Sequence, residues 1–169
     1  MDGASGIDAT VGLGGTFCPL PVRLVRPVWV APDAHGGQSG IVSDQNKAAA
    51  LVAFEVWGSG ELDRLDAIVA PDVIHHDPYD PNGSHGLAGM KKSIATNRAA
   101  YPDLRITVED QIAEADRVAT RWTAAMTHDG RRVTLKGITI DRFEDGKIVE
   151  AWRTIDMLSF LRQAKTPEE

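Results

Sequence analysis

The chain has 169 residues, of which 43% are hydrophobic and 25% are charged. This size and composition are typical of one globular domain with a core of its own. Its 24 acidic and 18 basic residues give a net charge of −6, which argues against nucleic acid or an anionic lipid surface as a partner. The single cysteine, Cys18, excludes an internal disulfide and favours a reducing compartment, so we expect a cytoplasmic protein. No apolar run reaches the length of a membrane-spanning helix.

Glycine and proline are concentrated at the start of the chain, where residues 1–40 hold 8 of the 16 glycines and 4 of the 9 prolines. The apolar stretch 17–31 is interrupted by three prolines and two arginines, so it is not a continuous signal-peptide core. We interpret residues 1–42 as a flexible extension. It is either an ordered arm packed on the domain or sequence outside the folding unit, and its composition favours the second. We therefore expect residues 1–40 to be dispensable for folding.

Helical signals begin at Ser43, a suitable N-cap for the helix that follows. Apolar residues recur at helical spacing as far as Trp57, and the glycines after it predict the end of this helix. A shorter helix is expected over 61–69 and a third over about 87–99. Between these two, the sequence predicts a strand over 72–77 and then a loop rich in proline.

From residue 104 onward the hydrophobic pattern changes to the alternation typical of strands. The pairs Asp129-Gly130 and Asp145-Gly146 are strong hairpin signals because they tolerate positive φ. A short helix is expected to end the domain, and residues 165–169 are expected to form a disordered tail. Helices followed by consecutive hairpins predict an α+β domain with an antiparallel sheet over 43–164. The predicted strands and last helix are 105–112, 117–128, 131–143, 147–155 and 157–163.

Six short strings, spread in order over this domain, carry a family resemblance. They are Phe54-Glu55-Val56-Trp57, Ala70-Pro71-Asp72-Val73, His76-Asp77-Pro78, Tyr101-Pro102-Asp103-Leu104, Asp116-Arg117-Val118-Ala119, and the run from Phe143 to Trp152. Their order and spacing resemble the SnoaL-like polyketide cyclase group of the nuclear-transport-factor-like superfamily. The resemblance implies a cone-shaped barrel, in which three N-terminal helices cover the concave face of a curved antiparallel sheet and leave a deep apolar pocket. It also implies a homodimer paired through the convex face, where we expect Ile148 and Trp152 to form an apolar patch. Members of the superfamily catalyse several unrelated reactions or only bind, so the fold does not determine the function.

The chain departs from the cyclase pattern at two positions. By the resemblance, the aspartate that serves as acid and base on the last strand of such cyclases falls on Arg153, and a cavity histidine of the preceding strand falls on Thr139. A guanidinium remains charged at all accessible pH values and cannot act as a base, but it can bind an enolate or a carboxylate. Epoxide hydrolases of the limonene type also share Trp152-Arg153, but the position of their carboxylate falls on Thr154.

Other titratable groups are candidates for the chemistry. Adjacent strand residues point to opposite faces, so only one of His75 and His76 can face the cone. The His-Asp-Pro string favours His76, either as a base near neutral pH or as a structural residue at the mouth. Asp156 is placed to pair with Arg153, as an ion pair or a catalytic dyad. Adjacent strand side chains cannot converge on one ion, so we expect no metal.

The sequence therefore predicts a small-molecule enzyme that acts on a hydrophobic, oxygenated substrate of polyketide or terpenoid type. The expected chemistry is cofactor-free proton transfer, as in cyclisation, isomerisation or hydration. The alternatives are a non-catalytic hydrophobic ligand-binding domain of the same fold and a dimeric protein-interaction module. The candidate catalytic residues are His76, Arg153 and Asp156, and the candidate substrate-binding residues are Trp57, Tyr101, Trp122, Met126 and Thr139.

Overall fold

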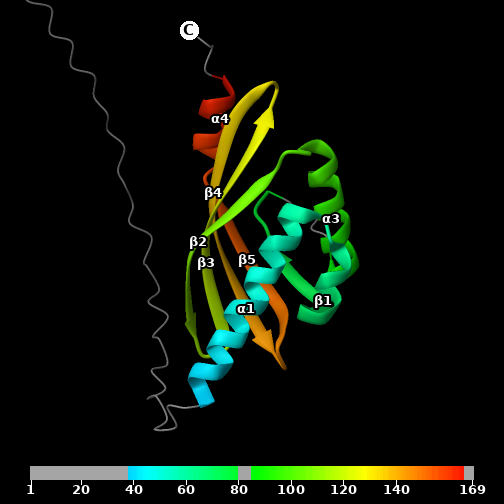
Figure 1. Ribbon diagram of the computed structural model, residues 1–169, viewed down its shortest axis with the longest axis vertical. Coiled ribbons are helices and arrows are strands. Elements are labelled where there is room, and N and C mark those ends of the chain that lie inside the picture. The colour runs from blue at the N-terminus through cyan, green and yellow to red at the C-terminus, as the bar shows by residue number, and fades with distance from the viewer. Residues whose placement is uncertain (1–37, 80–84, 166–169) are drawn as a thin grey trace, which may run out of the picture. The chain divides into compact units, whose positions relative to one another are not determined.

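The computed structural model describes residues 38–79 and 85–165 (Figure 1). The predicted flexible extension therefore lies outside the described residues up to position 37, and so does the predicted tail from position 166. None of the described helices is long and apolar enough to cross a membrane.

The first helix, α1 (Gln38–Ser59), begins five residues before the predicted start. The prediction of Ser43 as N-cap is wrong, because this residue lies inside the helix. Gly60 ends α1 in a positive φ of 84°, with its N–H donating to the Val56 carbonyl at 2.8 Å. Only glycine adopts this conformation without strain. The predicted second helix is shorter than expected: it consists of a 3₁₀ turn, η1 (Leu62–Arg64), and one helical turn, α2 (Leu65–Ile68).

Five strands form one open sheet in the order β1-β5-β4-β3-β2. The last four pair with their sequence neighbours as antiparallel hairpins, as predicted, but β1 pairs with β5 in parallel. The α+β class is confirmed, whereas the sheet is mixed and not closed into a barrel. The parallel pair joins the first strand to the last, and alternation within each strand does not reveal that contact. The strands are β1 (Val69–His76), β2 (Arg105–Glu114), β3 (Arg117–His128), β4 (Arg131–Glu144) and β5 (Lys147–Ile155).

A bulge in β5 changes which of its side chains point inward. Arg142 pairs with Glu150, but Phe143 pairs with Ile148, so Val149 is the extra residue. The extra residue reverses the alternation of the strand. Ile148 therefore points into the core, where it is 3% exposed, and the expectation that it shares the outer face with Trp152 is wrong.

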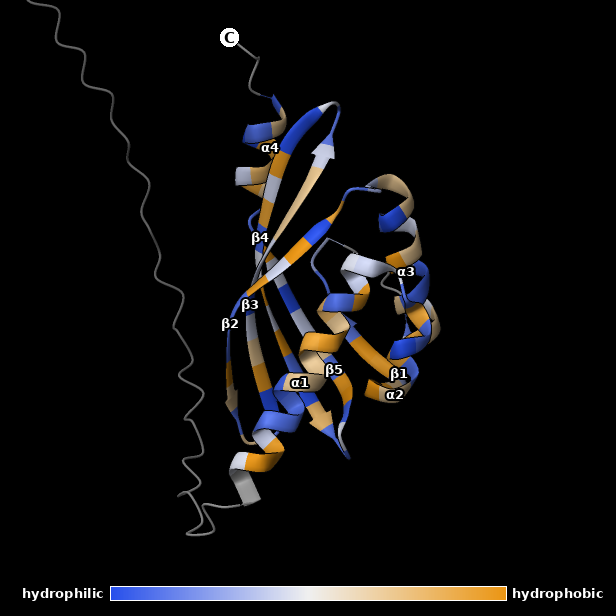
Figure 2. Cartoon of the chain, in the orientation of Figure 1, coloured by the Kyte–Doolittle hydropathy of each residue, from blue (hydrophilic) through white to orange (hydrophobic). Residues whose placement is uncertain are grey.

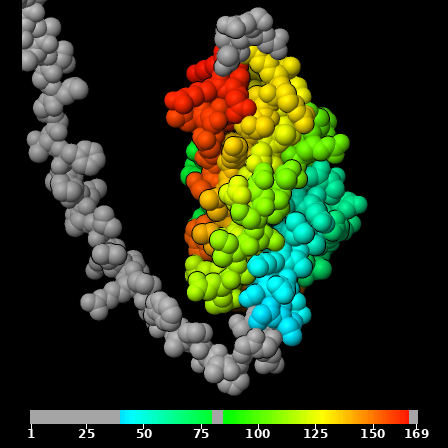
Figure 3. Space-filling view, turned by 60° about the vertical axis from the view of Figure 1, so that its left-hand side comes forward, coloured from blue at the N-terminus to red at the C-terminus, as the bar shows by residue number. Residues whose placement is uncertain are grey.

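Helices α1 and α3 (Gly86–Ala100) lie on one face of the sheet (Figure 1). Apolar residues are concentrated between these helices and the sheet (Figure 2). A second apolar cluster surrounds Trp122. It includes residues of β3 and β4, with Phe160 of α4 (Met157–Lys165) packed against it. Helix α4 packs beside β4 (Figure 3), where the Gln163 amide nitrogen donates to the Thr134 carbonyl at 2.9 Å. The space between these layers holds the candidate site.

Candidate functional site

A cavity of about 380 Å³ opens between the inner face of the sheet and the helices. This volume is within the range of small-molecule sites. Its lining is mostly apolar and aromatic, with a few polar groups. The cavity is lined by all five residues predicted to bind substrate, namely Trp57, Tyr101, Trp122, Met126 and Thr139. Their contact with a substrate remains a prediction.

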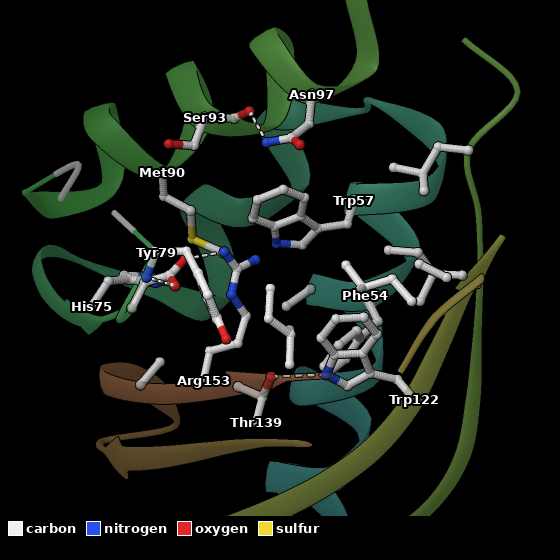
Figure 4. A pocket seen from close by; sticks show the side chains of 18 of the residues that line it. Phe54, Trp57, His75, Tyr79, Met90, Ser93, Asn97, Trp122, Thr139 and Arg153 are labelled. Atoms are coloured by element: carbon white, nitrogen blue, oxygen red, sulfur yellow. Dashed lines mark hydrogen bonds and ion pairs between the residues drawn. The ribbon is translucent and has the colours of Figure 1, made fainter. Parts of the chain in front are cut away.

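Arg153 projects from β5 into the cavity and forms an ion pair with Asp77, just beyond the end of β1 (Figure 4). Its guanidinium carbon lies 5.7 Å from the ring centre of Trp57, a cation–π contact. The Asp77 side chain is only 11% exposed and the Arg153 side chain 33%. Because the ion pair fixes only one end of the guanidinium, other N–H donors remain for a ligand.

Asp156 is not the partner of Arg153, which corrects the sequence interpretation. The chain leaves β5 at Ile155 and turns directly into α4. Asp156 Oδ1 accepts the Ser159 backbone N–H at 2.9 Å, the contact of an N-cap. Asp156 is also absent from the lining of the cavity. Its role in this structure is to start the last helix.

The two adjacent histidines point to opposite faces, but in the reverse of the predicted sense. His75 lines the cavity. His76 lies on the outer face, with Nε2 2.8 Å from Glu150 Oε1 and its ring stacked on Trp152 at 5.2 Å. Among the described residues, His75 Nε2 is buried without a hydrogen-bond partner. Burial, followed by the positive charge of Arg153, lowers the pKa of His75, which favours a neutral ring in the cavity.

Asp141 on β4 is a carboxylate that the sequence interpretation did not single out. It is 5% exposed and lines the cavity, and it pairs in register with Val118 and Ala151. Burial raises its pKa to about 7, because the charged form loses its hydration. The alternation of β4 was the available signal, since it places Asp141 on the same face as Phe143.

Two further polar contacts lie at the cavity wall. The Trp122 indole N–H donates to Thr139 Oγ1 at 3.0 Å, and the Tyr101 hydroxyl lies 3.2 Å from His128 Nδ1. Within residues 38–79 and 85–165, no three His, Cys, Asp or Glu side chains are grouped closely enough to hold a metal ion.

Comparison with protein families identifies the class of this fold and cavity. The model of the SnoaL-like polyketide cyclase family matches residues 47–164. The chain belongs to this family, as the sequence resemblance indicated. Comparison with curated protein sequences gave no match.

Several solved structures share the fold over 80% or more of their own length. IdmH from Streptomyces antibioticus, a proposed polyketide cyclase, is 28% identical and has a TM-score of 0.67, and the match covers 72% of this chain and 99% of IdmH. AclR from Streptomyces galilaeus, a proposed hydroxylase, is 32% identical with a TM-score of 0.62, covering 74% and 99%. A proposed polyketide cyclase from Bacillus cereus is 26% identical with a TM-score of 0.64, covering 71% and 80%. These relationships support a cyclase-type role on small molecules.

Proposed function

We propose that the protein catalyses cofactor-free proton transfer on a hydrophobic, oxygenated substrate, with Asp141 as the acid and base. The observation that carries this proposal is a buried carboxylate, with a pKa of about 7, in an apolar cavity. A group with a pKa near the working pH is available both to remove a proton and to return it. Burial causes the raised pKa of Asp141, because the charged form loses its hydration.

The proposed step starts with a ketone bound beside Asp141. The carboxylate removes a proton from the carbon next to the carbonyl, so that the C–H bond breaks and an O–H bond forms on Asp141. The electron pair moves onto the carbonyl oxygen as an enolate. The enolate carbon then attacks a second carbonyl of the substrate in a cyclisation, and the protonated carboxyl returns its proton to the new alkoxide. In an isomerisation, the proton returns to another carbon.

Arg153 is suited to bind the enolate oxygen in this scheme. Charge-assisted hydrogen bonds gain strength when water is excluded. Asp77 and Trp57 hold the guanidinium inside the cavity, so little reorganisation is needed when a negative charge develops. His75 Nε2, which has no hydrogen-bond partner among the described residues, offers a further hydrogen-bonding position beside it.

The proposal is tested with 2-tetralone, a bicyclic ketone with acidic C–H groups, in deuterated water. Proton NMR measures the loss of its C1 signals as deuterium enters. We expect the wild-type protein to accelerate this exchange and Asp141→Asn to lose at least about 100-fold of the acceleration. Exposed Asp72→Asn is the matched control. If the wild type binds tetralone without accelerating exchange, the binding-only alternative replaces the proposed catalysis.

We further propose that a second copy of the chain covers the outer face of the sheet. One register across β2, β3, β4 and β5 holds Ile112, Ala119, Ile140 and Trp152. Ile112 is 72% exposed and Ile140 is 37% exposed. An apolar row across four neighbouring strands is typical of an interaction surface, and a twofold axis can cover both copies at once. The cytoplasmic location remains a prediction from the single cysteine.

A further inference from the structure

The hydrogen bond between Trp122 and Thr139 has a fixed polarity. An indole N–H can only donate, so Thr139 Oγ1 is the acceptor in the 3.0 Å contact. The Thr139 O–H is therefore left to donate in another direction. Within the described parts of the chain, no protein acceptor for this O–H is found. Thr139 lines the cavity, so its free hydrogen is available to a ligand there.

The Trp122 ring is packed between Gly137 and Phe54. Trp122 pairs in register with Gly137, and its six-membered ring lies over the bare backbone of that glycine. A Cβ at Gly137 would overlap the ring and come within 2.8 Å of the Thr154 carbonyl oxygen. Phe54 packs against the indole from α1, at 6.1 Å between ring centres. Trp122 is thus a positioning residue for the Thr139 hydroxyl.

Thr139 and Arg153 are direct register partners on β4 and β5. Both line the cavity, and Figure 4 shows both side chains rising into it from the sheet. Directly paired residues on one face of a sheet have Cβ atoms about 5 Å apart. The Thr139 hydroxyl and the Arg153 guanidinium therefore come from adjacent positions on one face of the sheet and are donors to the same cavity.

We infer that Thr139 is a second oxyanion donor of the site, oriented by Trp122 and acting beside Arg153. The ligand chemistry that fits this pair is a delocalised oxyanion, such as an enolate, phenolate or carboxylate, attached to an apolar ring system. By the family resemblance, the aspartate that acts as acid and base in such cyclases falls on Arg153, and a cavity histidine falls on Thr139. In this chain these two positions hold donors instead. The inference rests on the proposed function in taking this cavity as the substrate site.

Equilibrium dialysis with 2-naphthoate and naphthalene tests this inference, because the two ligands share a ring system and differ in the oxyanion. We expect Thr139→Val to weaken 2-naphthoate binding by about tenfold or more, the usual range for a lost hydrogen bond to a charged group. Naphthalene binding should stay within about twofold of the wild type, because naphthalene has no acceptor atom for the Thr139 hydroxyl. Thr139→Ser keeps the hydroxyl and should restore most of the naphthoate affinity.

Thr154→Val is the matched control, since Thr154 lies next to Arg153 but is exposed. It should leave both affinities unchanged. Equal losses for naphthoate and naphthalene in Thr139→Val, or no rescue by Thr139→Ser, would overturn the role of the hydroxyl. A wild-type protein that binds naphthalene as tightly as 2-naphthoate would overturn the oxyanion site itself. Repeating the comparison with ionised 2-naphthol distinguishes a phenolate from a carboxylate preference.

Trp122→Phe tests the positioning role. It removes the indole N–H and frees the Thr139 hydroxyl to rotate, so the naphthoate-to-naphthalene affinity ratio should fall by about threefold or more. An unchanged ratio would overturn the contribution of Trp122. These binding measurements do not depend on turnover. If Asp141→Asn leaves tetralone exchange unchanged while the Thr139 results hold, only the proposed acid and base chemistry fails.

Discussion

Replacing Asp141 with asparagine should make the protein more stable above neutral pH while removing its proton transfer. Asp141 is buried among apolar neighbours, and its pKa rises from 3.8 to about 7 on folding. Between these two values the carboxyl is ionised in the unfolded chain and protonated in the folded protein. The unfolded state then binds fewer protons, so the free energy of unfolding falls as pH rises through this window. The loss is complete above pH 7.

The size of this effect follows from the two pKa values. The interval from 3.8 to about 7, at about 1.36 kcal/mol for each pKa unit, corresponds to about 4 kcal/mol of unfolding free energy. About 3 kcal/mol of it falls between pH 5 and pH 8. The lowered pKa of His75 has the opposite effect on the free energy of unfolding. The unfolded chain binds a proton at this ring more readily than the folded protein does, so this contribution to stability rises with pH. His75 is present in both the wild type and Asp141→Asn, so its contribution cancels in the difference between their stabilities.

The assay is urea unfolding of the wild type and Asp141→Asn at pH 5, 6, 7 and 8. The stability of the variant relative to the wild type should grow by about 3 kcal/mol from pH 5 to pH 8. Asp72→Asn, at an exposed carboxylate of β1, is the control for replacing a carboxylate outside the core. If the two stability curves of the wild type and Asp141→Asn run parallel, Asp141 titrates normally and the reasoning is refuted.

Three further predictions concern the ion pair, the histidines and the outer face. Arg153→Met should lower the free energy of unfolding, measured in urea, by about 3 kcal/mol, because it leaves the Asp77 carboxylate buried without its partner. Adding Asp77→Asn should recover most of this loss. An Arg153→Met protein as stable as the wild type would contradict the pairing. His76→Phe should leave 2-tetralone exchange within about twofold of the wild type, since its ring lies on the outer face. His75→Phe should slow the exchange, and the reverse ranking would mean that the inward histidine is misassigned. Sedimentation at micromolar concentration should give a dimer for the wild type and a monomer for Ile140→Lys, and a wild-type monomer would refute the interface.

The sequence predicted the elements whose signals are local. The Asp-Gly pairs marked two hairpins, and the change from helical spacing to alternation after residue 104 marked the start of the sheet. Trp57, Trp122 and Thr139 line the cavity. Their position could be predicted because the family pattern indicates which residues point inward. These features depend only on residues near each other in the chain.

The remaining features depend on contacts between distant residues. The parallel pairing of β1 with β5 and the ion pair of Arg153 with Asp77, 76 positions apart, leave no periodic signal. The bulge at Val149 reverses the alternation that placed Ile148 on the outer face. Asp141 was overlooked because an aspartate on an inward strand position is unusual in a core, although that same departure marks it as a functional candidate.

The pH dependence of 2-tetralone exchange tests the central claim most directly. If Asp141 is the base, the rate catalysed by the wild type should rise with pH and level off above about pH 7, as the carboxyl loses its proton. Asp141→Asn should show only the background rate across the same range. A wild-type rate that is already at its plateau by pH 5, or a variant that retains the same profile, would contradict the assignment of Asp141.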